Sequence, residues 1–193
     1  MSAPALGTVA HTLLAMRGVW LDHVEIFNLA GQPLDEDPLA GSPGKAPFDN
    51  LVYVDFDGEN FCQTNVTFRG RPLAVKTFSG RLIDGTLVFD RLGPNAPEHI
   101  GASAGPGTLF LNARRVGEAW SHYLEPDVLT LLSPIERTRV TMLYRNGVAV
   151  RTLRAHGTRL APSAAQRMDW DPRGIDGPVH QQSAFTDVFR ADA

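Results

Sequence analysis

The chain has 193 residues, of which 43% are hydrophobic and 20% charged, as is typical of a globular protein and not of a disordered chain. This length supports one hydrophobic core, so we expect a single main domain with irregular ends. The net charge of −3 lacks the basic excess that nucleic-acid binding requires, and no apolar run reaches the roughly 18 residues of a membrane span. We therefore expect no nucleic-acid partner, no membrane span and, because no basic leader segment is present, a cytoplasmic protein.

Near the N-terminus, residues 5–16 predict a short helix with Leu6, Val9, Leu13 and Leu14 on one side. We interpret residues 1–17 as a helical cap on the domain that follows.

From Val19 to Leu160, short β-branched and aromatic runs alternate with Gly, Asp, Asn and Pro, which predicts an antiparallel all-β domain. Three dipeptides tolerate the positive φ values of tight hairpin turns: Asp57-Gly58, Asp84-Gly85 and Asn146-Gly147. Consecutive hairpins form a meander, and closing it into a barrel removes the exposed edges. We predict an up-and-down β-barrel of about eight to ten strands over residues 18–160.

Two segments break this pattern. Residues 30–47 contain four prolines and predict a long irregular loop, which either covers a cavity mouth or is a surface insertion. Residues 161–193 form a polar tail with scattered apolar residues, which we expect to pack on the barrel or on a second subunit of a homodimer.

Several common chemistries have no support in the sequence. A single cysteine, Cys62, and six dispersed histidines give no metal-binding spacing, so we expect no metal and no cofactor. Residues 101–105 match the G-x-S-x-G pattern of serine hydrolases, but the prolines on both sides prevent the required strand and helix.

The hairpin around Asn146-Gly147 allows its register to be counted. If these two residues form the turn, Tyr144 faces Ala149 and Met142 faces Arg151. One face then carries Val140, Met142, Tyr144, Ala149, Arg151 and Leu153. This face is the more apolar, so we expect it to line the interior.

Arg151 would then be a cation on an inward face, and a buried guanidinium needs an acceptor. It either holds an oxygen of a ligand, with Tyr144 as a second donor, or forms a salt bridge to Asp22 or Asp55 or stacks on an indole. On the first strand, an inward Trp20 brings Asp22 and Val24 to the same side.

The tripeptide Gly18-Val19-Trp20, at the head of the first strand after a short helix, resembles the G-x-W signature of the lipocalin and calycin barrels. The later segments 124–126, 137–139, 145–147 and 152–154 resemble bacterial lipocalin-like proteins of uncharacterised function. This resemblance implies that Trp20 closes the barrel floor, that Arg151 or Arg154 packs over it, and that residues 30–47 partly cover the open end.

A barrel of this size can enclose one small ligand. One hypothesis is a binding protein for an apolar or amphipathic metabolite. The other is an enzyme that orients such a molecule for cofactor-free cyclisation or isomerisation, as the resemblance to small calycin-like cyclases of natural-product pathways implies. The candidate catalytic residues are Arg151 and Tyr144. The candidate ligand-binding residues are Trp20, Asp22, Val24, Val140, Met142 and Leu153.

Overall fold

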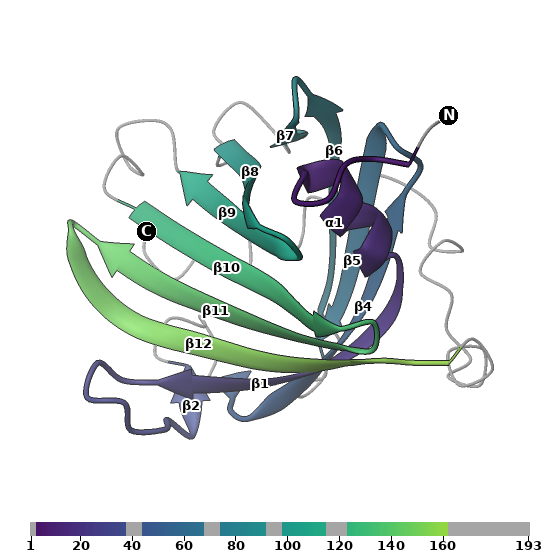
Figure 1. The fold of residues 1–193 in the computed structure, drawn as a ribbon. Helices are drawn as coiled ribbons and strands as arrows, with labels where there is room; N and C mark the ends of the chain where they lie inside the picture. The colour runs from purple at the N-terminus through teal and green to yellow at the C-terminus, as the bar shows by residue number, and fades with distance from the viewer. Residues whose placement is uncertain (1–2, 38–43, 68–73, 92–97, 115–122, 162–193) are drawn as a thin grey trace.

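The computed structural model describes residues 3–37, 44–67, 74–91, 98–114 and 123–161. These residues form one short helix and a closed antiparallel barrel of ten strands, with a separate two-stranded sheet (Figure 1). The elements are α1 (Val9–Met16), β1 (Gly18–Phe27), β2 (Glu36–Asp37), β3 (Gly44–Lys45), β4 (Phe48–Phe56), β5 (Asn60–Thr67), β6 (Ala74–Ile83), β7 (Thr86–Phe89), β8 (Glu98–Gly105), β9 (Thr108–Arg114), β10 (Tyr123–Ser133), β11 (Glu136–Arg145) and β12 (Val148–Arg159). The predicted all-β barrel is confirmed.

The barrel is a meander that closes on itself. Strands β4 to β12 pair in sequence order, and β1 completes the ring by pairing with both β12 and β4. Asp84 and Asn146 have φ values of 49° and 53°, and the glycine after each also has a positive φ, as the Asp-Gly and Asn-Gly signals predicted. The turn at Asp57 differs, because three residues rather than two separate β4 from β5.

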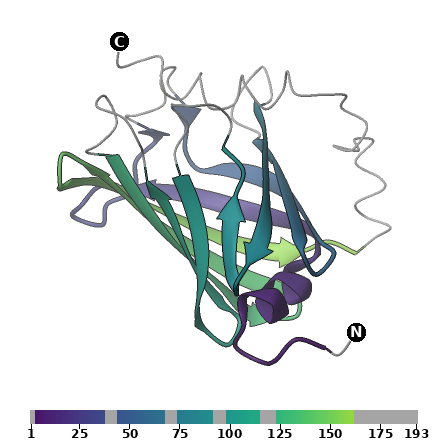
Figure 2. The ribbon, with the colours of Figure 1, turned by 90° about the horizontal axis from the view of Figure 1, so that it is seen from above.

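Helix α1 closes one end of the barrel (Figure 2). Thr8 caps the helix by accepting a hydrogen bond from the backbone N–H of His11 at 3.2 Å. Val9, Leu13 and Met16 are buried in a cluster with apolar side chains from β1, β4, β5, β7, β9 and β10. Leu6, predicted to share this face, precedes the helix and is 72% exposed.

Beyond this apolar floor, the inward side chains become polar and charged. Strict alternation along β10 sends Glu125, Asp127, Leu129 and Leu131 inward, whereas Val128 is 40% exposed on the outside. The same alternation on β11 sends Arg137, Arg139, Thr141 and Leu143 inward.

The register predicted for the β11–β12 hairpin is correct at its tip and wrong beyond it. Tyr144 pairs with Ala149 as expected, but Leu143 pairs with Arg151, so Val150 is an extra residue in β12. This irregularity shifts every later pair by one position. Met142 therefore faces Thr152 instead of Arg151, and Val140 faces Arg154 instead of Leu153.

The structure also bears on three segments that the sequence analysis singled out: residues 30–47, 101–105 and 161–193. The segment expected to lack regular structure contains the short β2–β3 pair, in which Glu36 faces Lys45. The expectation that no strand forms at the hydrolase-like string is wrong, because residues 101–105 lie in β8, but the element that follows is the strand β9 and not the helix that the motif requires. Ser103 donates a hydrogen bond to the carbonyl oxygen of Gly7 at 2.6 Å. The expected C-terminal tail lies outside the described residues, apart from its first residue, Ala161.

In the described part of the chain, no helix has the length and apolar character needed to cross a membrane.

Candidate functional site

Trp20 forms the centre of the barrel floor. Its side chain is fully buried, and its indole N–H donates to the carbonyl oxygen of Met16 at 2.8 Å. The guanidinium carbons of Arg137 and Arg159 each lie 4.6 Å from the indole centroid. The arginines packed on Trp20 are therefore Arg137 and Arg159, which corrects the expectation of Arg151 or Arg154.

Asp22 belongs to the same structural group. Its carboxylate accepts hydrogen bonds from Nε of Arg137 at 3.0 Å and from Nη2 at 2.7 Å, and both side chains are almost fully buried. Gly157 lies opposite Asp22, and a Cβ there would lie 2.9 Å from Cγ of Arg137 and would also collide with Oδ1 of Asp22. Asp22 therefore pairs with Arg137 and not, as one alternative proposed, with Arg151.

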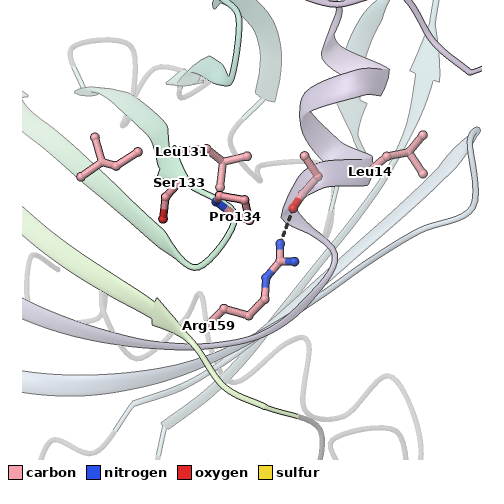
Figure 3. Close-up of a pocket in the computed structure, with 7 residues that line it drawn as sticks. Leu14, Leu131, Ser133, Pro134 and Arg159 are labelled. Atoms are coloured by element: carbon pink, nitrogen blue, oxygen red, sulfur yellow. Dashed lines mark hydrogen bonds between the residues drawn. The ribbon is translucent and has the colours of Figure 1, made fainter.

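An open groove of about 350 Å³ lies outside the barrel floor (Figure 3). The C-terminal end of α1 and the β10–β11 turn form its walls. Its lining residues are Leu14, Ala15, Leu131, Leu132, Ser133, Pro134 and Arg159. Arg159 donates through Nη2 to the carbonyl oxygen of Ala15, and burial together with the neighbouring charge of Arg137 lowers the pKa of Arg159. This arginine ties β12 to α1, so we assign it to structure.

The barrel interior contains a second ion pair, between Arg139 and Asp127. Nε of Arg139 donates to Oδ2 of Asp127 at 2.6 Å, and the Thr141 hydroxyl donates to Oδ1 at 2.9 Å. Burial raises the pKa of Asp127, and the charge of Arg139 opposes that rise. The Asp127 side chain is 7% exposed, whereas that of Arg139 is 31% exposed. The inward Arg139 side chain is therefore partly exposed to solvent, whereas its partner Asp127 is not.

Glu125 is the next inward residue of β10. It lies between Leu124 and Asp127, which pair with Tyr144 and Thr141, so the register places it level with Leu143 of β11. Leu143 in turn pairs with Arg151 of β12. Burial raises the pKa of Glu125, an effect that the charges of Arg151 and Arg139 oppose. Its side chain is half-buried, and within the described residues no hydrogen bond to its carboxyl group is recorded.

Five predicted site residues face inward: Trp20, Asp22, Val24, Arg151 and Leu153. They occupy different levels of the barrel. Trp20 and Asp22 belong to the floor, whereas Arg151, which is 8% exposed, lies level with Glu125. Leu153 is half-buried and faces Thr141.

The other three predicted residues face outward. Val140 is 45% exposed, and Met142 accepts a weak hydrogen bond from the outward Thr152 hydroxyl at 3.5 Å. Tyr144 pairs with Leu124, which is 38% exposed, and follows the fully buried Leu143. The expectation that Tyr144 acts beside Arg151 is therefore wrong, because the extra residue Val150 lets Arg151 and Tyr144 point to opposite sides of the sheet.

Sequence reasoning missed the interior residues Glu125, Asp127, Arg139 and Thr141. A signal existed: acids at alternate positions 125 and 127, followed after one turn by arginines at alternate positions 137 and 139. Residues with this period of two share one face of a strand. The unshifted register had assigned Arg139 and Thr141 to the outer face.

No protein-family model matches this chain, and no curated protein matches it. Solved structures do match. One is a protein of unknown function from the DUF3598 family of Nostoc punctiforme, with 13% identity and a TM-score of 0.57. The match covers 77% of this chain and 49% of that protein, so this chain spans about half of its length.

Another match is the S-type phycobiliprotein lyase CPES from Guillardia theta, with 12% identity and a TM-score of 0.57. It covers 80% of this chain and 93% of that one. At these identities the likeness is one of fold, that of a closed antiparallel β-barrel.

Among the described residues, no three or more His, Cys, Asp and Glu side chains lie close enough together to hold a metal ion.

Proposed function

We propose that this barrel binds a small amphipathic molecule in its interior. An anionic or carbonyl oxygen of the ligand lies against Arg139 and Arg151. Its apolar part lies against Leu153 and against Phe78 of β6, which shares a face with Gly80, the partner of the buried Phe61. The observation that carries this proposal is the inward side chain of Arg139, which is 31% exposed although its partner Asp127 is buried. Within the described residues, only its Nε atom has a recorded hydrogen-bond acceptor.

The ion pair with Asp127 suits Arg139 to this role. It holds the guanidinium through Nε, so little side-chain entropy is lost when a ligand binds the Nη groups. A guanidinium presents donors in a fixed fork that matches a carboxylate, and hydrogen bonds to charged groups contribute about 1.5–3 kcal/mol each. The proposed ligand class is therefore an amphipathic acid.

Fluorescence titration with dansylaminoundecanoic acid and with its methyl ester tests this proposal. The wild-type protein should bind the acid more tightly than the ester. Arg139→Met should weaken acid binding by about 10- to 100-fold, from the loss of one charge-assisted contact, and should change ester binding by less than about threefold.

The controls separate binding from folding. Arg81→Met removes an exposed arginine of β6 and should leave both affinities unchanged. The double variant Asp127→Asn/Arg139→Met leaves no buried carboxylate without its partner, and it should reproduce the loss of acid selectivity. Equal affinity of the wild-type protein for acid and ester, or equal losses of both in the Arg139 variants, would contradict the proposal.

A second candidate function is cofactor-free conversion of the bound molecule by isomerisation or cyclisation. The inward carboxyl of Glu125 favours it, because a carboxyl group beside two arginines can move a proton while the arginines stabilise charge on oxygen. Native mass spectrometry would identify a co-purified molecule, which is then incubated with the protein in deuterium oxide. Deuterium incorporation that Glu125→Gln abolishes is expected for proton-transfer catalysis, and an unlabelled, unchanged molecule is expected for a carrier.

A further inference from the structure

Glu125 lies among the charged groups of the interior, at the level where the proposed ligand head group binds. Arg139, on the neighbouring strand β11, and Arg151, on β12, both interact electrostatically with its carboxyl group. Asp127 is the next inward residue on its own strand, and its carboxylate is already held by Arg139 and Thr141. The two carboxyl groups therefore differ: Asp127 has hydrogen-bond donors, and none is recorded for Glu125 in the described ranges.

Charges from other strands also face this carboxyl group. Lys76 of β6 interacts with it across the barrel. His99 of β8 lies in the same row of the sheet, since it pairs with position 113 of β9, which pairs with Glu125. His99 itself contacts the rings of Phe78 and Phe89, at centroid distances of 6.3 and 5.7 Å.

We propose that Glu125 takes up a proton when an anionic group binds at Arg139 and Arg151, so that the site couples the binding of an amphipathic acid to protonation of its own carboxyl. This inference rests on the proposed function. In the free protein, the charges of Arg139 and Arg151 stabilise the ionised form of the Glu125 carboxyl group. A bound anion competes for the same cations and brings a second negative charge beside Glu125.

Two carboxylates that share one buried site repel each other, and protonating one of them removes the repulsion. The protonated Glu125 also becomes a donor that can share its proton with the ligand oxygen. The ligand therefore raises the pKa of Glu125 above its already raised value in the free protein. The affinity for an anion is then highest at low pH and falls as pH rises from the free to the bound pKa, by at most about tenfold per pH unit for one proton.

Titration calorimetry in phosphate and in Tris measures the protons taken up, because the two buffers differ in ionisation enthalpy. We would titrate anilinonaphthalene sulfonate and dansylaminoundecanoic acid at several pH values from about pH 5.5 to about pH 8.5, above the ordinary pKa of a glutamate. The sulfonate stays ionised throughout, so any proton taken up with it belongs to the protein. The wild-type protein should take up as much as one proton per sulfonate bound.

Glu125→Gln should take up none of this proton, and its affinity should be independent of pH. Near pH 8 it should bind the sulfonate more tightly than the wild-type protein, a gain that loss of a purely structural residue would not produce. Glu136→Gln, at an exposed position of β11, is the matched control and should retain the uptake. Urea unfolding of both variants checks that each is folded.

The outcomes are distinguishable. Proton uptake that persists in Glu125→Gln assigns the proton to another group, such as His99, and overturns the inference. Binding without uptake in the wild-type protein overturns the inference and leaves the proposed function standing. If neither probe binds the wild-type protein, the proposed function fails, and this inference fails with it.

Discussion

Asp22 and Asp55 form ion pairs with arginines in opposite surroundings. The Asp22–Arg137 pair is buried in the barrel floor, where Arg137 also packs on Trp20. The Asp55–Arg17 pair lies 3.4 Å apart with both side chains more than half exposed. Water screens the charges of the exposed Asp55–Arg17 pair, so this pair contributes little to stability. The buried Asp22–Arg137 pair has lost its hydration, and its two charge-assisted hydrogen bonds compensate for that loss.

Asp22→Asn should lower the free energy of unfolding by about 3–5 kcal/mol, because it leaves the buried charge of Arg137 without its counterion. Asp55→Asn should lower it by less than about 1 kcal/mol. Urea denaturation of the two variants gives both values. Similar values for the two substitutions would show that the floor pair does not stabilise the fold as described.

Alternation along a strand predicted the orientation of part of the candidate site, but the sequence did not predict which side chains contact one another. The inward orientation of Trp20, Asp22 and Arg151 follows from alternation along strands, and it is confirmed. The register between strands that are far apart in the sequence determines which arginine packs on Trp20. Arg137 and Arg159 meet on one indole only because β12 pairs with both β1 and β11, a contact that local patterns do not encode.

Among the elements, hairpins were predictable and the bulge was not. Asp-Gly and Asn-Gly mark turns because few other residues adopt positive φ there. Val150 lies in an ordinary β-branched run, and nothing in its neighbours distinguishes an extra residue from a paired one. One unpaired residue was enough to reverse the predicted faces of β11 and to hide Arg139 from sequence reasoning.

The β4–β5 turn should respond to acid. Asp57 accepts hydrogen bonds from the side chain of Asn60 and from the backbone N–H groups of Asn60 and Glu59, and the Asn60 amide is the main reason that the pKa of Asp57 is lowered to about 2. A lowered pKa stabilises the folded state above the unfolded value, near 3.8, and this contribution is lost as pH falls towards 2.

Asp57→Ala should therefore be less stable than the wild-type protein at about pH 5, and the difference should shrink as pH falls from about 4 to about 2. Urea midpoints at several pH values measure this. In a carboxyl NMR titration, Asn60→Ala should move the pKa of Asp57 back towards its ordinary value. A gap in stability that stays constant with pH would contradict this account of the turn.

Across the whole molecule, the apolar floor of the barrel stabilises the fold, and the charged interior contains the candidate site. The floor packs α1 against strands from most of the ring, and it contributes hydrophobic burial. The barrel interior next to the floor contains Arg139, Asp127 and Glu125, and burying these charged groups lowers the stability of the fold because they lose hydration. Buried charged residues that break the hydrophobic pattern of a fold are expected at functional sites. The hydrophobic pattern of the sequence therefore did not predict the part of the interior that contains the candidate site.

This division predicts that α1 and the barrel unfold together. Leu13 is 1% exposed in the shared cluster, so Leu13→Ala should lower the free energy of unfolding by about 2–5 kcal/mol. The exposed Leu6 is the control, and Leu6→Ala should change it by less than about 0.5 kcal/mol. Native-state hydrogen exchange should show equal losses of protection in α1 and β10. A loss of protection confined to α1 would instead mean that the helix unfolds independently of the barrel. If α1 and β10 share one core, a substitution in that core must reduce the protection of both elements.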